Sequence, residues 1–95
     1  MTSILVEGYT ASKGFCRGGS NPGDHRHPAG AVWHEDRNCK ERCDKTPTCT
    51  GFNFPVYPPD ANMCGTIDSV GATGDGTGDP SVGIAICYMK QAGIY

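Results

Sequence analysis

The chain lacks the sequence patterns on which most hydrolases, thiol redox proteins and membrane proteins depend. It has no Cys-x-x-Cys pair and no Gly-x-Ser-x-Gly motif, which argues against a redox or zinc-ribbon site and against a nucleophile elbow. No apolar run approaches the ~20 residues of a transmembrane helix. We therefore expect a non-enzymatic domain that has no cofactor and does not insert into a membrane.

Charge and hydrophobic residues are also scarce. The chain has 8 Lys and Arg against 10 Asp and Glu, a net charge of -2, whereas nucleic acids and anionic membranes are bound by basic surfaces. Neither partner is expected.

Only 37% of the 95 residues are hydrophobic and one is Trp. A single domain with so thin a core needs covalent support.

Cysteine is what the sequence has in quantity. Six cysteines stand at positions 16, 39, 43, 49, 64 and 87. An even number of dispersed cysteines in a short chain is typical of a disulfide framework formed in an oxidising compartment. Three disulfide bridges, each of which stabilises a fold by about 2–4 kcal/mol, would compensate for the small hydrophobic core. Full pairing also leaves no thiolate to act as a nucleophile or metal ligand.

One helix is predicted, over about Glu35–Lys45. Acidic residues at its start suit the positive end of the helix dipole, and Pro47 disfavours helical geometry in the residue before it. Cys39 and Cys43 are four residues apart, so they lie on one face of the helix and can each bridge to a different strand.

Alternating apolar residues predict three strands, at residues 48–54, 63–68 and 83–90. The last of them is the most apolar, so we expect it to be central, with Ile84, Ile86 and Tyr88 on one face.

The rest of the chain is assigned by composition. A short N-terminal strand is expected near Ile4-Leu5-Val6, and the Gly-rich stretches 17–30 and 69–83 are predicted loops. Ile4-Leu5-Val6 is too short for the apolar part of a signal peptide. We therefore expect a module that belongs to a larger secreted protein.

Two stretches contain residue types that are found in ligand sites. His25, His27 and His34 with Glu35 invite a zinc or copper site, but the spacing of ligands is wrong, and solvated loop histidines are the better interpretation. The run 74–79 has the glycines of a phosphate loop and the aspartates of a calcium loop. It is followed by Pro80 and a predicted strand rather than a helix, and it lacks the other EF-hand ligands. We interpret it as a mobile connection, and expect no metal site.

The order of the features is more specific than any one of them. The ordered set is Cys16, the helical Cys39-x3-Cys43, Cys49 opening a strand with Phe52-x-Phe54, Cys64, and Cys87-Tyr88-x-Lys90. Together they resemble a PAN/apple domain. The resemblance covers residues 8–91 and leaves residues 1–7 and 92–95 as flanking segments.

The resemblance implies a small disulfide-rich α+β fold in which one helix packs across a curved antiparallel β-sheet. It also implies the pairing Cys39–Cys64 and Cys43–Cys49, with an outer Cys16–Cys87 bridge. The outer bridge would tie the two ends of the domain together, as suits one bead of a tandem array. The loops 17–30 and 69–83 depart from the usual pattern, which leaves the ligand open.

PAN/apple modules recognise proteins or carbohydrates in coagulation zymogens, growth factors, plant receptor kinases and the microneme adhesins of apicomplexan parasites. The resemblance therefore implies an extracellular recognition or adhesion module, monomeric when isolated, that binds a protein or glycan on a cell surface or matrix. The alternative is a structural module that mediates assembly through protein contacts, without a ligand of its own.

Five residues are candidates for ligand binding: Trp33, His34, Lys45, Asn53 and Tyr57. Aromatic rings stack on the apolar face of a sugar while amides and charges bind its hydroxyls. Trp33 has an alternative role in core packing at the start of the helix, whereas Tyr57 lies among prolines and is expected to be exposed.

Overall fold

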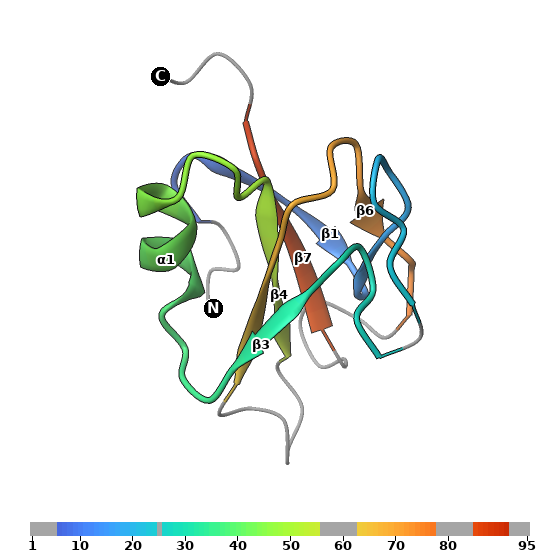
Figure 1. The fold of residues 1–95 in the computed structure, drawn as a ribbon, viewed down its shortest axis with the longest axis horizontal. Coiled ribbons are helices and arrows are strands. Elements are labelled where there is room, and N and C mark those ends of the chain that lie inside the picture. The colour runs from blue at the N-terminus through green and yellow to red at the C-terminus, as the bar shows by residue number, and fades with distance from the viewer. Residues whose placement is uncertain (1–5, 25, 56–62, 78–84, 92–95) are drawn as a thin grey trace.

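The structure is a computed structural model that describes residues 6–24, 26–55, 63–77 and 85–91. It is a small α+β fold with one helix, an antiparallel sheet and three disulfides, which confirms the predicted class. Helix α1 (Cys39–Lys45) lies on one side of the sheet, and β6 lies with the loops on the other (Figure 1). Within the described ranges, no helix has the length and apolar character needed to cross a bilayer.

The main sheet has five strands. In spatial order they are β1 (Tyr9–Lys13), β7 (Ala85–Lys90), β4 (Gly51–Pro55), β5 (Cys64–Ile67) and β3 (Val32–His34). A second sheet pairs β2 (Cys16–Arg17) with β6 (Thr73–Gly74). The predicted last strand is thus an interior strand, although the middle position belongs to β4.

The two faces of the sheet carry separate hydrophobic clusters. Phe52 on β4 and Ile86 and Tyr88 on β7 pack on the helix side, and the Phe52 and Tyr88 rings stack with centroids 4.9 Å apart. Cys87 and Met89, the intervening residues of β7, pack on the opposite side. The predicted alternation of the last strand is confirmed for these residues, while Ile84 lies outside the described residues.

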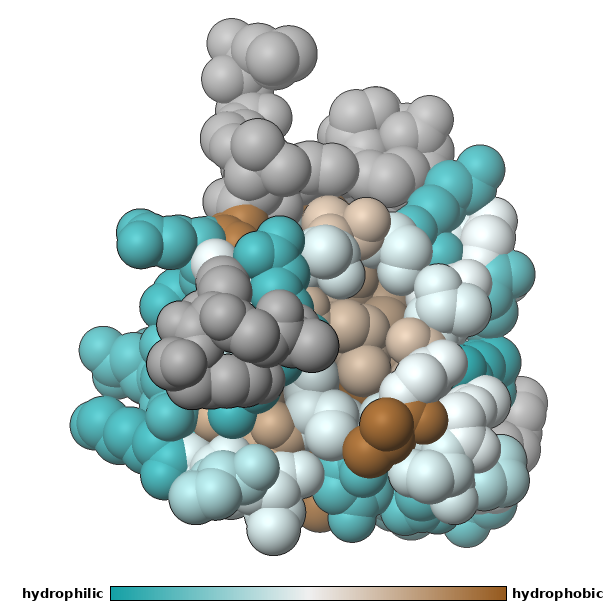
Figure 2. All heavy atoms as spheres, turned by 90° about the horizontal axis from the view of Figure 1, so that it is seen from above, coloured by the Kyte–Doolittle hydropathy of each residue, from teal (hydrophilic) through white to brown (hydrophobic). Residues whose placement is uncertain are grey.

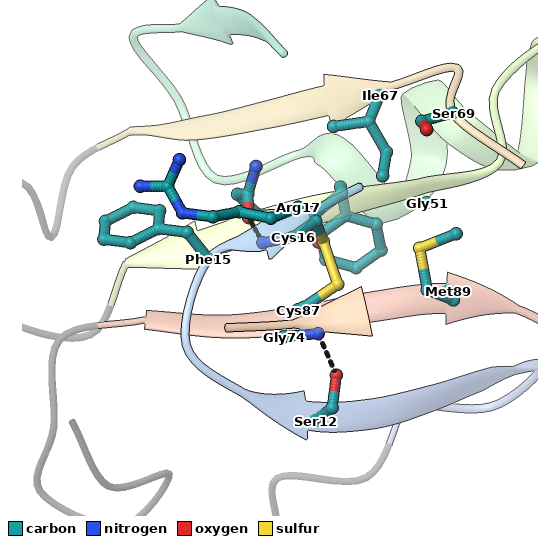
Figure 3. The surroundings of a disulfide bond; sticks show 12 residues. Ser12, Phe15, Cys16, Arg17, Gly51, Ile67, Ser69, Gly74, Cys87 and Met89 are labelled. Carbon is teal, nitrogen blue, oxygen red and sulfur yellow. Dashed lines mark hydrogen bonds between the residues drawn. A yellow bond between two sulfur atoms is a disulfide. The ribbon is translucent and has the colours of Figure 1, made fainter. Parts of the chain in front are cut away.

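The three disulfides divide between the two faces. Cys39–Cys64 joins the helix to β5, Cys43–Cys49 joins it to the segment that precedes β4, and Cys16–Cys87 joins β2 to β7 on the other side (Figure 3). This is the pairing that the family resemblance implies. All six cysteines are buried, so the bridges replace part of the apolar core that the composition lacks.

The helix begins at Cys39, four residues later than expected. The reason is β3, which pairs with β5 through His34↔Cys64 and leaves the next residues to turn the chain. Asp36 stabilises this turn, because its carboxylate accepts a hydrogen bond from the Asn38 amide at 3.0 Å and forms an ion pair with Arg42. Asp36 therefore stabilises the turn before the helix, whose N-cap residue, Asn38, makes no side-chain capping hydrogen bond, and the predicted end at Lys45 is confirmed.

The loop predicted at 69–83 is hydrogen-bonded over its described part, up to residue 77. The Gly74 amide donates to Ser12 Oγ at 2.8 Å (Figure 3), and the Gly76 amide donates to the Lys13 carbonyl at 2.9 Å. Asp75 donates its amide to the Phe15 carbonyl at 2.9 Å. Where the sequence predicted a connecting loop, these residues are thus hydrogen-bonded to the chain around β2, and Thr73 and Gly74 form β6.

The two ends of the described core lie together. Tyr9 is paired with Lys90 across β1 and β7, and the Gln91 amide donates to the Gly8 carbonyl at 2.9 Å. The short N-terminal strand was expected nearer Ile4-Leu5-Val6, of which only Val6 is described, and β1 begins at Tyr9.

Candidate recognition site

A cavity of about 320 Å³ lies next to the cluster on the side of the sheet away from the helix. Seven of the described residues line it: Phe15, Arg17, Arg26, Pro28, Trp33, Pro55 and Met63. We call it the Trp33 pocket. Its lining combines aromatic and other apolar residues with two arginines, the composition expected of a site that binds a small ligand or one residue of a larger one.

Trp33 is held in a fixed position at this pocket. Its indole Nε1 donates a hydrogen bond to the Arg26 carbonyl at 2.9 Å, and the edge of its ring meets Phe15 with centroids 6.3 Å apart. The side chain is half-buried and packs against the cluster that surrounds Cys87. Trp33 thus contributes to packing and also presents a surface to the pocket.

The loop that carries Arg26 is shaped by Asp24. The Asp24 carboxylate accepts hydrogen bonds from the backbone amides of Arg26 and His27 at 2.9 and 2.8 Å, and its Oδ1 lies 3.1 Å from His27 Nδ1. The backbone bond from His27, followed by the contact with its ring, lowers the pKa of the Asp24 carboxyl. This turn brings the Arg26 carbonyl to the indole. His27 therefore has a structural role, because its amide and ring both contact Asp24 within the loop.

Arg17 is oriented by Asp75. Arg17 Nε donates to Asp75 Oδ2 at 2.7 Å, and Asp75 also accepts bonds from the Phe15 amide and from Thr77. Burial acts to raise the pKa of the Asp75 carboxyl, but the bonds from Thr77 and Arg17 outweigh it and the pKa is lowered. Asp75 therefore remains an anion behind the pocket, and the Arg17 guanidinium extends beside the Phe15 ring (Figure 3).

Arg37 supports the wall formed by Pro55 and Met63. Its Nη1 donates to the carbonyl oxygens of Pro55 and Met63 at 2.5 and 3.1 Å, and its guanidinium carbon lies 3.6 Å from the centre of the Phe54 ring. Burial lowers the pKa of Arg37, yet a guanidinium remains charged. One cation thus joins the end of β4 to the residue that precedes β5.

The candidate residues are dispersed over the molecule. Trp33 lines the pocket; His34, the next residue on β3, contacts Thr66 Oγ1 through Nε2 at 3.2 Å. Lys45 is exposed at the end of the helix. Tyr57 lies outside the described residues.

Asn53 does not fit a ligand surface, because it is fully buried. Its Oδ1 accepts the Cys16 amide at 2.5 Å, and Nδ2 has no hydrogen-bond partner among the residues described. Its side chain connects β4 with β2 beneath the surface.

Phe15, Arg17 and Arg26 were not anticipated as site residues. Nothing in the local sequence connects them with Trp33, since the contacts depend on how β2 and the 17–30 loop fold over the sheet. Over the described ranges, no three or more His, Cys, Asp and Glu side chains gather in a group that suits a metal ion.

Comparison with known proteins finds no matching family model, curated protein or solved structure. The pocket and the disulfide framework are therefore the basis on which a function is inferred.

Proposed function

We propose that this chain is an extracellular recognition module of the PAN/apple type, which binds a glycan or protein partner through the Trp33 pocket and has no catalytic activity. It would serve as one adhesive bead of a larger secreted protein, of which a microneme adhesin is one example. The observation that carries the proposal is the corner formed by Trp33 and Phe15, flanked by Arg17 and Arg26.

The pocket supports recognition because its parts are preorganised. The Trp33 indole is fixed by the Arg26 carbonyl, and Arg17 is fixed by Asp75. Fixed side chains lose little conformational freedom when a ligand binds, which favours affinity. The cavity of about 320 Å³ lies within the usual range for small-molecule sites.

The disulfides support the extracellular assignment. Three buried bridges form and persist in oxidising compartments, and they are rare in the reducing cytosol.

Assembly through a broad apolar face is the competing function. Among the described residues, the large hydrophobic side chains that are exposed are Val32 and Val70, at 58% and 66%. Figure 2 shows one face of the molecule, on which strongly hydrophobic atoms form small separate spots between hydrophilic groups. A stable protein interface buries about 800 Å² per partner around an apolar centre. The described surface favours a small ligand site instead.

A glycan array probed with the oxidised domain tests the proposal. We expect specific binding that is lost in Trp33→Ala and weakened in Trp33→Phe, because the phenyl ring is smaller and has no N–H to bind the Arg26 carbonyl. Val70→Ala is the control, since it removes an exposed apolar side chain that does not line the pocket. If no glycan binds, the same variants are compared in a pull-down from cell-surface extracts. Binding that survives in correctly bridged Trp33→Ala contradicts the proposed site.

A further inference from the structure

We infer that the Trp33 pocket takes an acidic saccharide, with the sugar ring against Trp33 and Phe15 and the carboxylate or sulfate bound by Arg17 and Arg26. This inference rests on the proposed recognition function and makes its ligand specific. The two arginines and the aromatic corner belong to one cavity.

Arg17 is arranged as an anion receptor. Its Nε is occupied by Asp75, while its two terminal nitrogens have no partner among the described residues. The Arg17 side chain is 44% exposed, whereas that of Asp75 is 15% exposed. The carboxylate therefore fixes the guanidinium through Nε and leaves donors on its terminal nitrogens, from which a second anion can accept hydrogen bonds.

The charge balance of the pocket favours a ligand with one negative charge. Among the residues that the structure describes, the charged ones that line the cavity are Arg17 and Arg26, and Asp75 neutralises the first of them. The Arg26 side chain has no partner among the described residues. The pocket therefore retains one positive charge in a chain whose overall charge is -2.

Four of the lining residues offer no free backbone amide to a peptide. Pro28 and Pro55 have no amide hydrogen, and the amides of Phe15 and Arg26 already donate to Asp75 and Asp24. A peptide that binds as an extended strand needs free main-chain donors. A sugar ring needs an apolar surface and side-chain donors, and the pocket offers both.

Trp33 makes the inference directly measurable, because it is the one tryptophan of the chain and its fluorescence reports on the pocket alone. The probes are glucuronic acid and galactose 6-sulfate, with glucose and galactose as neutral counterparts. We expect the acidic sugars to bind at least about tenfold more tightly than the neutral ones, the difference that a charge-assisted pair of hydrogen bonds supplies. The stronger of the two acidic probes identifies whether the acid is a carboxylate or a sulfate.

The variants are Arg17→Gln, Arg26→Gln and, as a matched control, Arg42→Gln. Arg42 has the same side-chain exposure as Arg17, 44%, and also pairs with an aspartate, but it lies on the helix. We expect Arg17→Gln to weaken binding about tenfold or more and Arg42→Gln to leave it unchanged. Arg26→Gln keeps the carbonyl that fixes Trp33, so a loss of binding in this variant is independent of any instability caused by Arg17→Gln.

The remaining outcomes overturn the inference, and they separate it from the proposed function. Equal binding of acidic and neutral sugars in a Trp33-dependent manner rejects the anion site and retains the module as a lectin. An equal loss in Arg42→Gln shows general charge attraction instead of a site. Binding of a Glu-rich peptide without any saccharide rejects the sugar but retains protein recognition. If no saccharide, peptide or extract protein binds in a Trp33-dependent manner, the recognition function fails as well.

Discussion

Gly65 on β5 lies directly opposite Trp33 on β3, and a Cβ placed on Gly65 would be only 2.8 Å from Cε3 of the indole. The missing side chain provides the space in which the tryptophan lies. The position of the residue proposed to be central to recognition is thus set by a glycine on the neighbouring strand, which itself has no side chain to bind a ligand.

Gly65→Ala is therefore expected to displace the indole. Overpacking of this kind costs about 1–3 kcal/mol, even though alanine suits a strand better than glycine does. The free energy of unfolding should fall and the tryptophan emission should shift, with Val32→Ala, an exposed change on β3, as the control. Unchanged emission from a stable Gly65→Ala variant would show that the indole does not depend on this space.

Arg37→Gln should destabilise the fold by about 2 kcal/mol, because it removes charged hydrogen bonds to two carbonyls and a cation–π contact. The exposed ion pair of Arg42 with Asp36 should contribute about 0–1 kcal/mol, so Arg42→Gln serves as the comparison. Urea unfolding measures both. Equal effects of the two substitutions would contradict the role assigned to Arg37 at the ends of β4 and β5.

The disulfides that close the longest and the shortest loop should differ in their contribution to stability. Cys16–Cys87 spans 71 residues, whereas Cys43–Cys49 spans 6. In the chain-entropy description, losing the first costs about 4 kcal/mol and losing the second about 2 kcal/mol. Each bridge is replaced by a pair of alanines, so the buried volume removed is the same in both variants, and the free energies of unfolding are compared. The reverse order would show that local packing, not loop length, controls these bridges.

Asp75 should give part of the acid sensitivity of the domain. Its pKa in the folded chain is lowered from an unfolded value of about 3.9. Its contribution to stability is therefore complete above that value and is lost as the pH falls through the lower folded pKa. Melting temperatures of Asp75→Asn should depend less on pH below about 4 than those of the parent.

Three other aspartates contribute to the same loss of stability at low pH, and one of them is Asp24, whose pKa is lowered by its hydrogen bonds with His27 and Arg26. Hydrogen bonds from Arg42 to Asp36 and from Lys40 to Asp44 also lower the pKa of these carboxyls, so some acid sensitivity should persist in Asp75→Asn. Glu41→Gln, on the exposed face of the helix, controls for the change in net charge. Identical pH profiles of Asp75→Asn and the parent would contradict the role of Asp75.

The sequence predicted those parts of the fold that local patterns control. The alternation of Ile86 and Tyr88 against Cys87, and the end of the helix at Lys45, depend on neighbouring residues and are confirmed. The start of the helix and the position of β4 within the sheet depend on strand pairing between distant segments, which no local window contains.

The candidate site was predicted less well for the same reason. Trp33 stands out as the one tryptophan, but Arg17 is brought to the pocket by a carboxylate 58 residues away in the chain. Asn53 illustrates the opposite error, since a polar side chain on a strand was expected at the surface and is buried as the acceptor of a backbone amide.

The adjacency of Gly8 and Gln91, combined with the Cys16–Cys87 bridge, has a mechanical consequence. A pulling force applied at residues 8 and 91 would separate β1 from β7 pair by pair, starting at Tyr9↔Lys90. The peeling would stop at the bridge, after which the tension passes through the sulfur atoms and bypasses everything between residues 16 and 87. The pocket residues Arg17, Arg26 and Trp33 all lie within that closed loop, so a ligand bound there would be shielded from the load that the chain carries.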